Sequence, residues 1–471
     1  MKVLLTLFAI ILVSCTASIP SSRIGEVQQD VPGRWSATPQ ARAGIDTNWV
    51  RRLGGARAES LVEEALSANP DMRVAAERVN RAVASAQSAG AALNPQIEAG
   101  LSSSRLKQNF VGFPFGVGEG GVPSSVSNSY GTTISVNWEP DIWGFNRAGV
   151  SAQIAQAQAE GQTYRAARAS LAAQVLRAWL ALAEANEKID LVAESQQLLK
   201  TTYEIVRDRF ESALSEEGGS ASQMRLVESQ LDTTRAVLAQ RNGERAQAIR
   251  QLELLMGRYP AGEILSADTL PSLPPTPPVG LPSELLLRRP DLLAAERNFA
   301  SSGSLLKQAK LAFYPSIKLT TSGGTRSEGL RDLVDSNFGV WSLAGSLTQP
   351  IWRGGVIRSE EKRIKSEDRL ALANLQRVVL RAFAEVEQAL IADRFLAQRE
   401  KAIASAVSSA KSASEAAYSD YAGGTGDALT LIKAQQNCID LDSQLVTLHR
   451  LRLDNRVTLH LALGGDYRVE K

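Results

Sequence analysis

The chain has 471 residues, of which 44% are hydrophobic, so it is neither a disordered chain nor a multi-span helical membrane protein. Its 52 basic and 50 acidic residues leave a net charge of +2, a balance that excludes the basic footprint of a nucleic-acid-binding protein. With only two cysteines and two histidines, neither a disulfide framework nor a zinc cluster is expected, and we predict no metal site and no cofactor.

Residues 1–14 have the pattern of a signal peptide. Lys2 is a short basic region, and the apolar run at residues 3–13 is too short to span a bilayer. The run ends in Leu-Val-Ser-Cys, which resembles a bacterial lipobox, so we expect cleavage before Cys15 and a covalent lipid on it. A plain signal peptide followed by a chance cysteine is the alternative. Thr16, where inner-membrane lipoproteins carry Asp, points to the outer membrane.

The next part of the chain predicts helices followed by two strands. Residues 15–57 are polar, with scattered Pro and Gly, and predict an extended segment along the folded body. Asn69-Pro70 separates two helical patterns, and Asn94-Pro95 ends the second. The predicted helices are residues 58–68 and 71–93; the predicted strands are residues 96–104 and 130–139, with a Gly-, Pro- and Ser-rich loop at 105–129.

A very long helix is predicted at residues 146–212, which contain no proline. Apolar residues there alternate in steps of four and three, a 3.5-residue repeat typical of a left-handed coiled coil. At 1.5 Å per residue such a helix is about 100 Å long, which no globular core needs. Gly218-Gly219 ends it, and residues 221–256 predict a return helix.

The same plan then occurs a second time. A Pro-rich linker at residues 257–282 separates a first repeat, residues 58–256, from a second, residues 283–464. Arg289-Pro290-Asp291 in the second repeat corresponds to Asn69-Pro70-Asp71 in the first. The second repeat predicts strands at 316–322 and 338–348, a long helix at 355–422 that stops at Gly423-Gly424, a return helix at 427–463, and a tail at 465–471.

These elements predict a mainly α fold with a small β part, in which the protomer is internally duplicated. The strands have the length of tilted outer-membrane strands. Four strands cannot close a barrel, and open edges are not tolerated in lipid, so several chains must contribute. Three chains would give a trimeric 12-stranded β-barrel, and the same assembly would place the long helices in a ring, as a hollow α-helical barrel.

Three motifs carry a resemblance to a known family: NPDMRVAAERV at residues 69–79, NWEPDIWG at 137–144 and SELLLRRPDLLAAERNF at 283–299. With the lipobox and the duplication, they resemble the TolC-like outer-membrane efflux factors, in their lipoprotein branch. The resemblance implies a homotrimeric, lipid-anchored duct in the bacterial outer membrane that extends into the periplasm. It would work with an inner-membrane transporter and a periplasmic adaptor, and would not be an enzyme. Arg51 to Gly55 depart from the acidic-proline pair of many relatives.

The predicted function is passive export of small molecules such as drugs and toxic compounds. A duct for secreted polypeptides is an alternative, which the lipobox disfavours because family members serving protein secretion usually lack it. A structural periplasmic coiled-coil lipoprotein is a second alternative, although a spacer needs no membrane strands.

The hairpin tips carry the candidate functional residues. In the family such tips meet the adaptor, and the adaptor-contact candidates are Gly218, Gly219, Gly423 and Gly424. Relatives narrow the pore with an apolar and an acidic ring near the start of the second return helix. The corresponding gate candidates are Leu429 for the apolar ring, Asp427 for the acidic ring, and Glu228 with Lys433 as a charge pair between neighbouring hairpins. Solvated helix charges are the alternative for that pair.

Two further groups of residues are interpreted without a catalytic role. His449, His460 and Cys438 lie on the last helix without a ligand set around them, so packing or surface roles are expected. Four tryptophans lie near the strand ends and fit either a core or an interfacial aromatic belt: Trp138, Trp143, Trp341 and Trp352.

Overall fold

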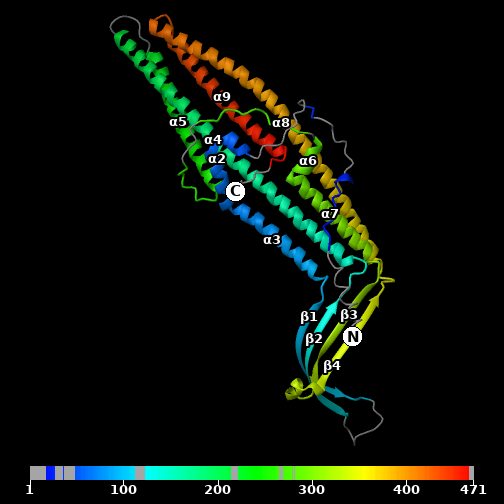
Figure 1. The fold of residues 1–471 in the computed structure, drawn as a ribbon. Helices are drawn as coiled ribbons and strands as arrows, with labels where there is room; N and C mark the ends of the chain where they lie inside the picture. The colour runs from blue at the N-terminus through cyan, green and yellow to red at the C-terminus, as the bar shows by residue number, and fades with distance from the viewer. Residues whose placement is uncertain are drawn as a thin grey trace. The chain divides into compact units, whose positions relative to one another are not determined.

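The computed structural model describes residues 17–26, 35–36, 48–111, 122–213, 221–264, 269–277, 279–280 and 282–465 (Figure 1). The chain forms two compact units. One contains residues 1–27, 79–160 and 295–375, and the other contains residues 28–78, 161–294 and 376–471. Each unit therefore draws on both sequence repeats. Cys15, Gly218 and Gly219 lie outside the described residues.

The described helices follow the predicted order twice, and the fold is mainly α with a small β part, as predicted. The two long helices contain 69 and 68 residues, within a residue or two of their predicted ends. No helix in the described part of the chain is both long and apolar enough to cross a membrane. The helices are α2 (Trp49–Ala68), α3 (Pro70–Ala91), α4 (Phe145–Ala213), α5 (Ala221–Leu255), α6 (Pro282–Arg288), α7 (Pro290–Leu311), α8 (Val356–Gly423) and α9 (Ala428–Ala462).

The first unit contains an antiparallel sheet with the strand order β1-β2-β3-β4. Pairing of β2 with β3 joins the two sequence repeats, and it places Thr133 opposite Gly324. The strands are β1 (Gln96–Asn109), β2 (Ser124–Trp138), β3 (Ser316–Ser327) and β4 (Gly339–Thr348).

Three strands are longer than predicted, and much of the predicted loop at residues 105–129 is wrong. Residues 105–109 continue β1, and residues 124–129 continue β2, where Leu106 pairs with Ser127 and Lys107 with Val126. β3 likewise extends to Ser327 rather than residue 322. Serine-rich composition suggested a loop, but backbone hydrogen bonds along a ladder do not depend on side-chain type, so the pairing continues through polar residues.

The predicted extended segment at residues 15–57 is also wrong at its end, because α2 begins at Trp49. Trp49, Val50 and Leu53 are fully buried, and their spacing places them on one helical face. The Trp49 ring stacks on the His460 ring at 5.9 Å between centroids. Gly55, with φ of 78°, interrupts the helical geometry. Burial of this apolar face outweighs the low helix propensity of the glycines.

The duplicated Pro motif forms the same joint in both repeats. Asn69 is buried, and its Nδ2 donates to the Leu255 carbonyl at the end of α5, at 2.7 Å. Arg289 is buried too, and its Nη1 donates to the Ala462 carbonyl at the end of α9, at 3.1 Å. Each joint thus satisfies a carbonyl that the end of a return helix leaves open.

Candidate functional site

The tip of the two helical hairpins is held by a small buried cluster in the second unit. Val227 on α5 and Leu431 on α9 have no exposed surface, and Tyr421 near the end of α8 is 3% exposed. The Arg209 guanidinium lies over the Tyr421 ring at 4.6 Å and donates to the Ala422 carbonyl at 3.0 Å. These contacts tie the last turns of α4 to those of α8.

Gly423 and Gly424 form the described turn at this tip. Gly423 is the last residue of α8, and Gly424 has φ of 84°, a conformation that favours glycine. The backbone N–H of Gly424 donates to the Tyr421 carbonyl at 3.1 Å. Gly424 therefore ends the helix, and contact with an adaptor stays a prediction for both glycines.

Asp427, one of the gate candidates, caps the start of α9. Its carboxylate accepts from the backbone N–H of Thr430 at 3.0 Å and from the Thr430 hydroxyl at 2.6 Å. These hydrogen bonds lower the pKa of Asp427, so it is ionised at neutral pH and fits an acidic position at the tip. Leu429, in the first turn of α9, is 45% exposed and remains available as an apolar residue.

The structure pairs Glu228 with a different partner from the predicted one. Glu228 Oε2 lies 2.7 Å from Arg225 Nη1, three residues earlier on α5. Within the described residues of one protomer, Lys433 is exposed and no ion pair joins it to Glu228. The pair of Glu228 with Lys433 is therefore not formed within the protomer. Glu228 pairs instead with Arg225, which lies three residues earlier on the same helix face. A pair between protomers stays a prediction.

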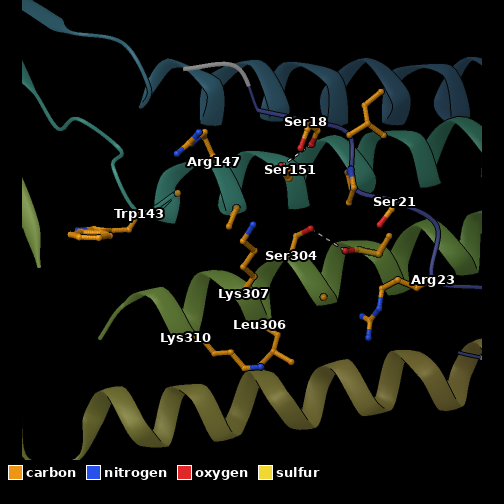
Figure 2. A pocket seen from close by; sticks show the side chains of 16 residues that line it. Ser18, Ser21, Arg23, Trp143, Arg147, Ser151, Ser304, Leu306, Lys307 and Lys310 are labelled. Atoms are coloured by element: carbon orange, nitrogen blue, oxygen red, sulfur yellow. Dashed lines mark hydrogen bonds between the residues drawn. The ribbon is translucent and has the colours of Figure 1, made fainter. Parts of the chain in front are cut away.

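The N-terminal segment at residues 17–26 borders a cavity of about 760 Å³ in the first unit (Figure 2). Besides this segment, its walls are the start of α4 and the second half of α7. The Ser151 hydroxyl on α4 donates to the Ser18 carbonyl at 2.8 Å, which fixes the segment against the helix.

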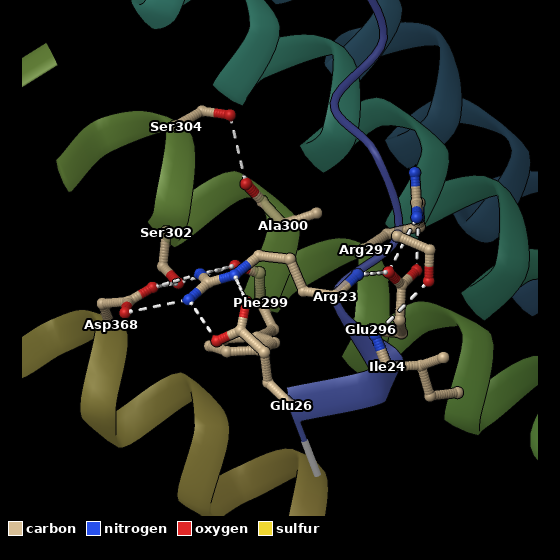
Figure 3. Close-up of polar contacts among 11 residues, drawn as sticks. Arg23, Ile24, Glu26, Glu296, Arg297, Phe299, Ala300, Ser302, Ser304 and Asp368 are labelled. Atoms are coloured by element: carbon tan, nitrogen blue, oxygen red, sulfur yellow. Dashed lines mark hydrogen bonds and ion pairs between the residues drawn. The ribbon is translucent and has the colours of Figure 1, made fainter. Parts of the chain in front are cut away.

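Arg23 clamps the same segment to α7 and α8 (Figure 3). Its Nη1 donates to Asp368 Oδ1 at 2.5 Å and to the Phe299 carbonyl at 3.1 Å. Its Nε donates to Glu26 at 2.9 Å, and its guanidinium lies 3.7 Å from the centroid of the Phe299 ring. The backbone N–H of Arg23 donates to Glu296 Oε1 at 3.0 Å. The Arg23 side chain thus joins the segment to α7 and α8, while its bond to Glu26 lies within the segment.

The carboxylates of this clamp are ionised at neutral pH. Burial alone would raise the pKa of Asp368, but hydrogen bonds from Arg23 and Ser302 lower it below its ordinary value. Burial likewise opposes ionisation of Glu296, and hydrogen bonds from Arg297 and Ser22 lower its pKa. Since both pKa values are lowered, the clamp contributes stability above the ordinary carboxyl range and loses it only as the pH falls through the lowered values.

Replacing Arg23 with Gln should release the N-terminal segment while leaving the rest of the fold intact. The partly buried pair with Asp368 is worth roughly 1–3 kcal/mol, as expected for hydrogen bonds to charged groups. Limited proteolysis should then cleave residues 17–26 at least about fivefold faster than in the parent at pH 7. Arg331→Gln is the matched control, because that side chain is 93% exposed. Equal cleavage of the parent and the Arg23 variant would show that the clamp does not hold the segment.

The four tryptophans near the strand ends divide between the two interpretations. Trp138 is buried, and its Nε1 donates to the Leu93 carbonyl at 3.2 Å, so it belongs to the core. Trp341 and Trp352 are exposed, as an interfacial belt requires. Trp143 is half exposed, and its Nε1 donates to the Pro315 carbonyl at 2.8 Å.

The histidines and the cysteine of α9 have packing partners. His449 lies between Glu400, 3.1 Å from its Nδ1, and the Pro271 carbonyl, 2.9 Å from its Nε2. His460 is buried against Trp49. Cys438 is partly buried, and burial raises the pKa of its thiol, which makes it a poor nucleophile. The described residues contain no group of His, Cys, Asp and Glu suited to hold a metal ion.

Comparison with known proteins places the chain in a family. The family model described as outer membrane efflux protein matches residues 61–258 and 281–465. Cation efflux system protein CusC of Escherichia coli O6:H1 is 26% identical over 414 residues, which cover 87% of this chain and 86% of CusC. Probable outer membrane lipoprotein SilC of Salmonella typhimurium is 26% identical over 443 residues, which cover 92% of this chain and 91% of SilC.

A solved structure of the outer-membrane channel OprN has the same fold. It superposes on this chain with a TM-score of 0.86 at 23% sequence identity, covering 96% of this chain and all of that one. The family model accounts for well over half of the sequence and matches both repeats. The chain therefore belongs to the outer membrane efflux protein family, as its motifs predicted, and is an efflux channel of the bacterial outer membrane.

Proposed function

We propose that three copies of this chain form a passive duct, which exports small toxic molecules or drugs delivered by an inner-membrane transporter through a periplasmic adaptor. The observation that carries this proposal is the four-stranded sheet, in which β1 and β4 are the outer strands. In lipid an open edge would leave backbone groups without partners, so β4 of one protomer needs β1 of the next. Three such sheets give twelve strands, an even number within the range of outer-membrane barrels.

The outer strands support this placement by their exposed apolar side chains. On β1, Ile97 and Leu101 are 72% and 75% exposed and lie on one face. On β4, Trp341 and Leu343 are 83% and 73% exposed, and they also share a face. Water would disfavour so much apolar surface, whereas lipid accommodates it.

The duct is tested by conductance and by export. Purified protein in detergent should be a trimer by light scattering and should form ion-conducting pores in planar bilayers, which a structural spacer would not. A strain lacking the chain should become more susceptible to drugs or toxic compounds, and the parental gene should restore resistance. A monodisperse monomer, or a deletion strain with unchanged susceptibility to every compound tested, would contradict the proposal.

Lipid on Cys15 is the second part of the proposal, supported by the lipobox and by the relative named as a lipoprotein. Cys15→Ser should leave a chain without acyl groups, and outer-membrane localisation should fall without being abolished, because the strands can still insert. Membrane fractionation measures this fall. Mass spectrometry that finds an unmodified mature N-terminus at another residue would exclude the anchor.

The gate is the third part, and Leu429 is its apolar candidate. Its exposed position at the start of α9 suits a ring of three leucines that narrows the pore. Leu429→Ser should raise single-channel conductance and vancomycin susceptibility severalfold. Serine side chains are smaller and more polar than leucine, so a ring of three serines leaves a wider opening that water enters more easily. Leu198→Ser, whose leucine is 46% exposed on α4, is the matched control. If both variants behave like the parent, Leu429 does not close the duct.

A further inference from the structure

The cavity beside the N-terminal segment has an unbalanced charge. Of the described residues that line it, four are basic and none is acidic. The basic residues are Arg23, Arg147, Lys307 and Lys310. Serine hydroxyls from the segment, from α4 and from α7 also face it, and Figure 2 shows Lys307 projecting from α7 toward α4. Cations and hydroxyls without carboxylates form a lining suited to an anion.

Two of the four cations are uncommitted. Arg23 is engaged by Asp368 and Glu26, and Arg147 lies 3.4 Å from Asp141. Lys307 and Lys310 are exposed, and within the described residues neither has an ion-pair partner. Lys310 only lowers the pKa of Asp368 from a distance, and Arg23 and Ser302 already donate to that carboxylate. Lys307 and Lys310 therefore place positive charge at the cavity that no ion pair among the described residues neutralises.

The walls of the cavity connect directly to membrane strands. Its α4 wall begins shortly after β2 ends at Trp138, and its α7 wall ends shortly before β3 begins at Ser316. Trp143, which lines the cavity, packs against the Tyr314 ring at 5.5 Å, and both rings are about half exposed, as in an interfacial belt. With the strands in the outer membrane, the cavity lies at the level of the lipid headgroups.

The lipid expected on Cys15 would also place the cavity near the lipid headgroups. Only two residues lie between Cys15 and Ser18 in the cavity wall, so the chain between them spans at most about 11 Å. Acyl chains on Cys15 would enter the leaflet that faces the helices, so phospholipid headgroups of that leaflet lie within reach of the lysines.

We propose that this cavity binds the headgroup of an anionic phospholipid, with the phosphate held by Lys307 and Lys310. The inference rests on the proposed insertion of the strands in the membrane. A bound headgroup would neutralise the two lysines. It would also attach the N-terminal segment to the same membrane leaflet that the lipid on Cys15 enters.

The test compares lipid binding by the parent and by the double variant Lys307→Gln, Lys310→Gln. The purified full chain in detergent is titrated with phosphatidylglycerol and, separately, with phosphatidylcholine, and bound lipid is counted by native mass spectrometry. The parent should prefer phosphatidylglycerol. The double variant should lose about 25-fold in affinity, since each lysine near an anionic lipid contributes about fivefold. Lys362→Gln with Lys365→Gln, exposed lysines of α8 outside the cavity, should bind like the parent.

Two outcomes would overturn the proposal. Equal binding of phosphatidylglycerol by the double variant and the parent would place the lipid elsewhere. Lysine-dependent binding of inorganic phosphate without binding of phosphatidylglycerol would make the site one for free phosphate. Conductance measured on the same preparations separates this inference from the duct itself, because the double variant should conduct like the parent.

Discussion

Replacing Gly324 with Ala should disrupt the pairing of β2 with β3 and reduce the folded protein in the outer membrane by about tenfold or more. A Cβ at this position would lie 1.9 Å from the Thr132 carbonyl oxygen and 2.7 Å from its carbon. Both atoms belong to the backbone of β2, so no side-chain rotation relieves the clash. β2 and β3 must separate locally and lose ladder hydrogen bonds, and a loss of about 1.4 kcal/mol already changes an equilibrium tenfold.

Gly323→Ala is the matched control, because a Cβ on that neighbouring residue meets no atom within 4 Å. It makes the same chemical change in the same strand and should assemble like the parent. Outer-membrane fractions assayed for folded trimer provide the measurement for both variants. Normal assembly of the Gly324 variant would mean that the β2–β3 pairing differs from the one described here.

Arg289→Ala should lower the free energy of unfolding by about 1.5–3 kcal/mol, the range for hydrogen bonds made by a charged group. The Arg289 side chain is 8% exposed and lies 2.7 Å from both Asp291 and Glu385. Its removal leaves Asp291 without its ion-pair partner and the Ala462 carbonyl without its donor, whereas Glu385 keeps its pair with Arg381. Chemical denaturation followed by circular dichroism, on the purified protein in detergent, measures the loss.

The adjacent Arg288 provides the control for this substitution. Its side chain is 40% exposed, and it pairs with Glu284 at 3.1 Å across one helical turn. Such a pair contributes about 0.3–0.5 kcal/mol, so Arg288→Ala should barely change the unfolding curve. Similar losses in the two variants would show that burial and the contact with Ala462 do not distinguish Arg289.

The long helices and their duplication could be predicted from sequence because their signals are local. Proline and glycine mark the ends of the elements, and the steps of four and three residues persist along each long helix. The beginning of α2 could not be predicted, because burial of Trp49 against His460 joins residues from opposite ends of the chain. The extensions of β1 and β2 were missed because a ladder of serines has the composition of a loop.

Among the candidate sites too, contacts between residues close in sequence were predictable and contacts between distant residues were not. The Arg225–Glu228 pair could have been predicted from the three-residue spacing on one helix, although the expected partner of Glu228 was Lys433. The Arg23 clamp had no such signal, because Asp368 follows it by 345 positions and Arg23 lies in a segment without periodicity. The basic cavity was equally hidden, since Arg147 and Lys307 come together only through packing of α4 and α7.

The two joints at the Pro motifs perform one task with different chemistry. The first uses the neutral amide of Asn69, whereas the second uses a guanidinium that pairs with Asp291. Burial alone would raise the pKa of Asp291, but the hydrogen bond and the charge of Arg289 outweigh it and lower that pKa. Because that pKa is lowered overall, the second joint is intact at neutral pH and weakens only as the pH falls through the lowered value; the amide joint does not titrate at all. Gene duplication thus left two joints at equivalent positions, of which only the second depends on an ionised carboxylate.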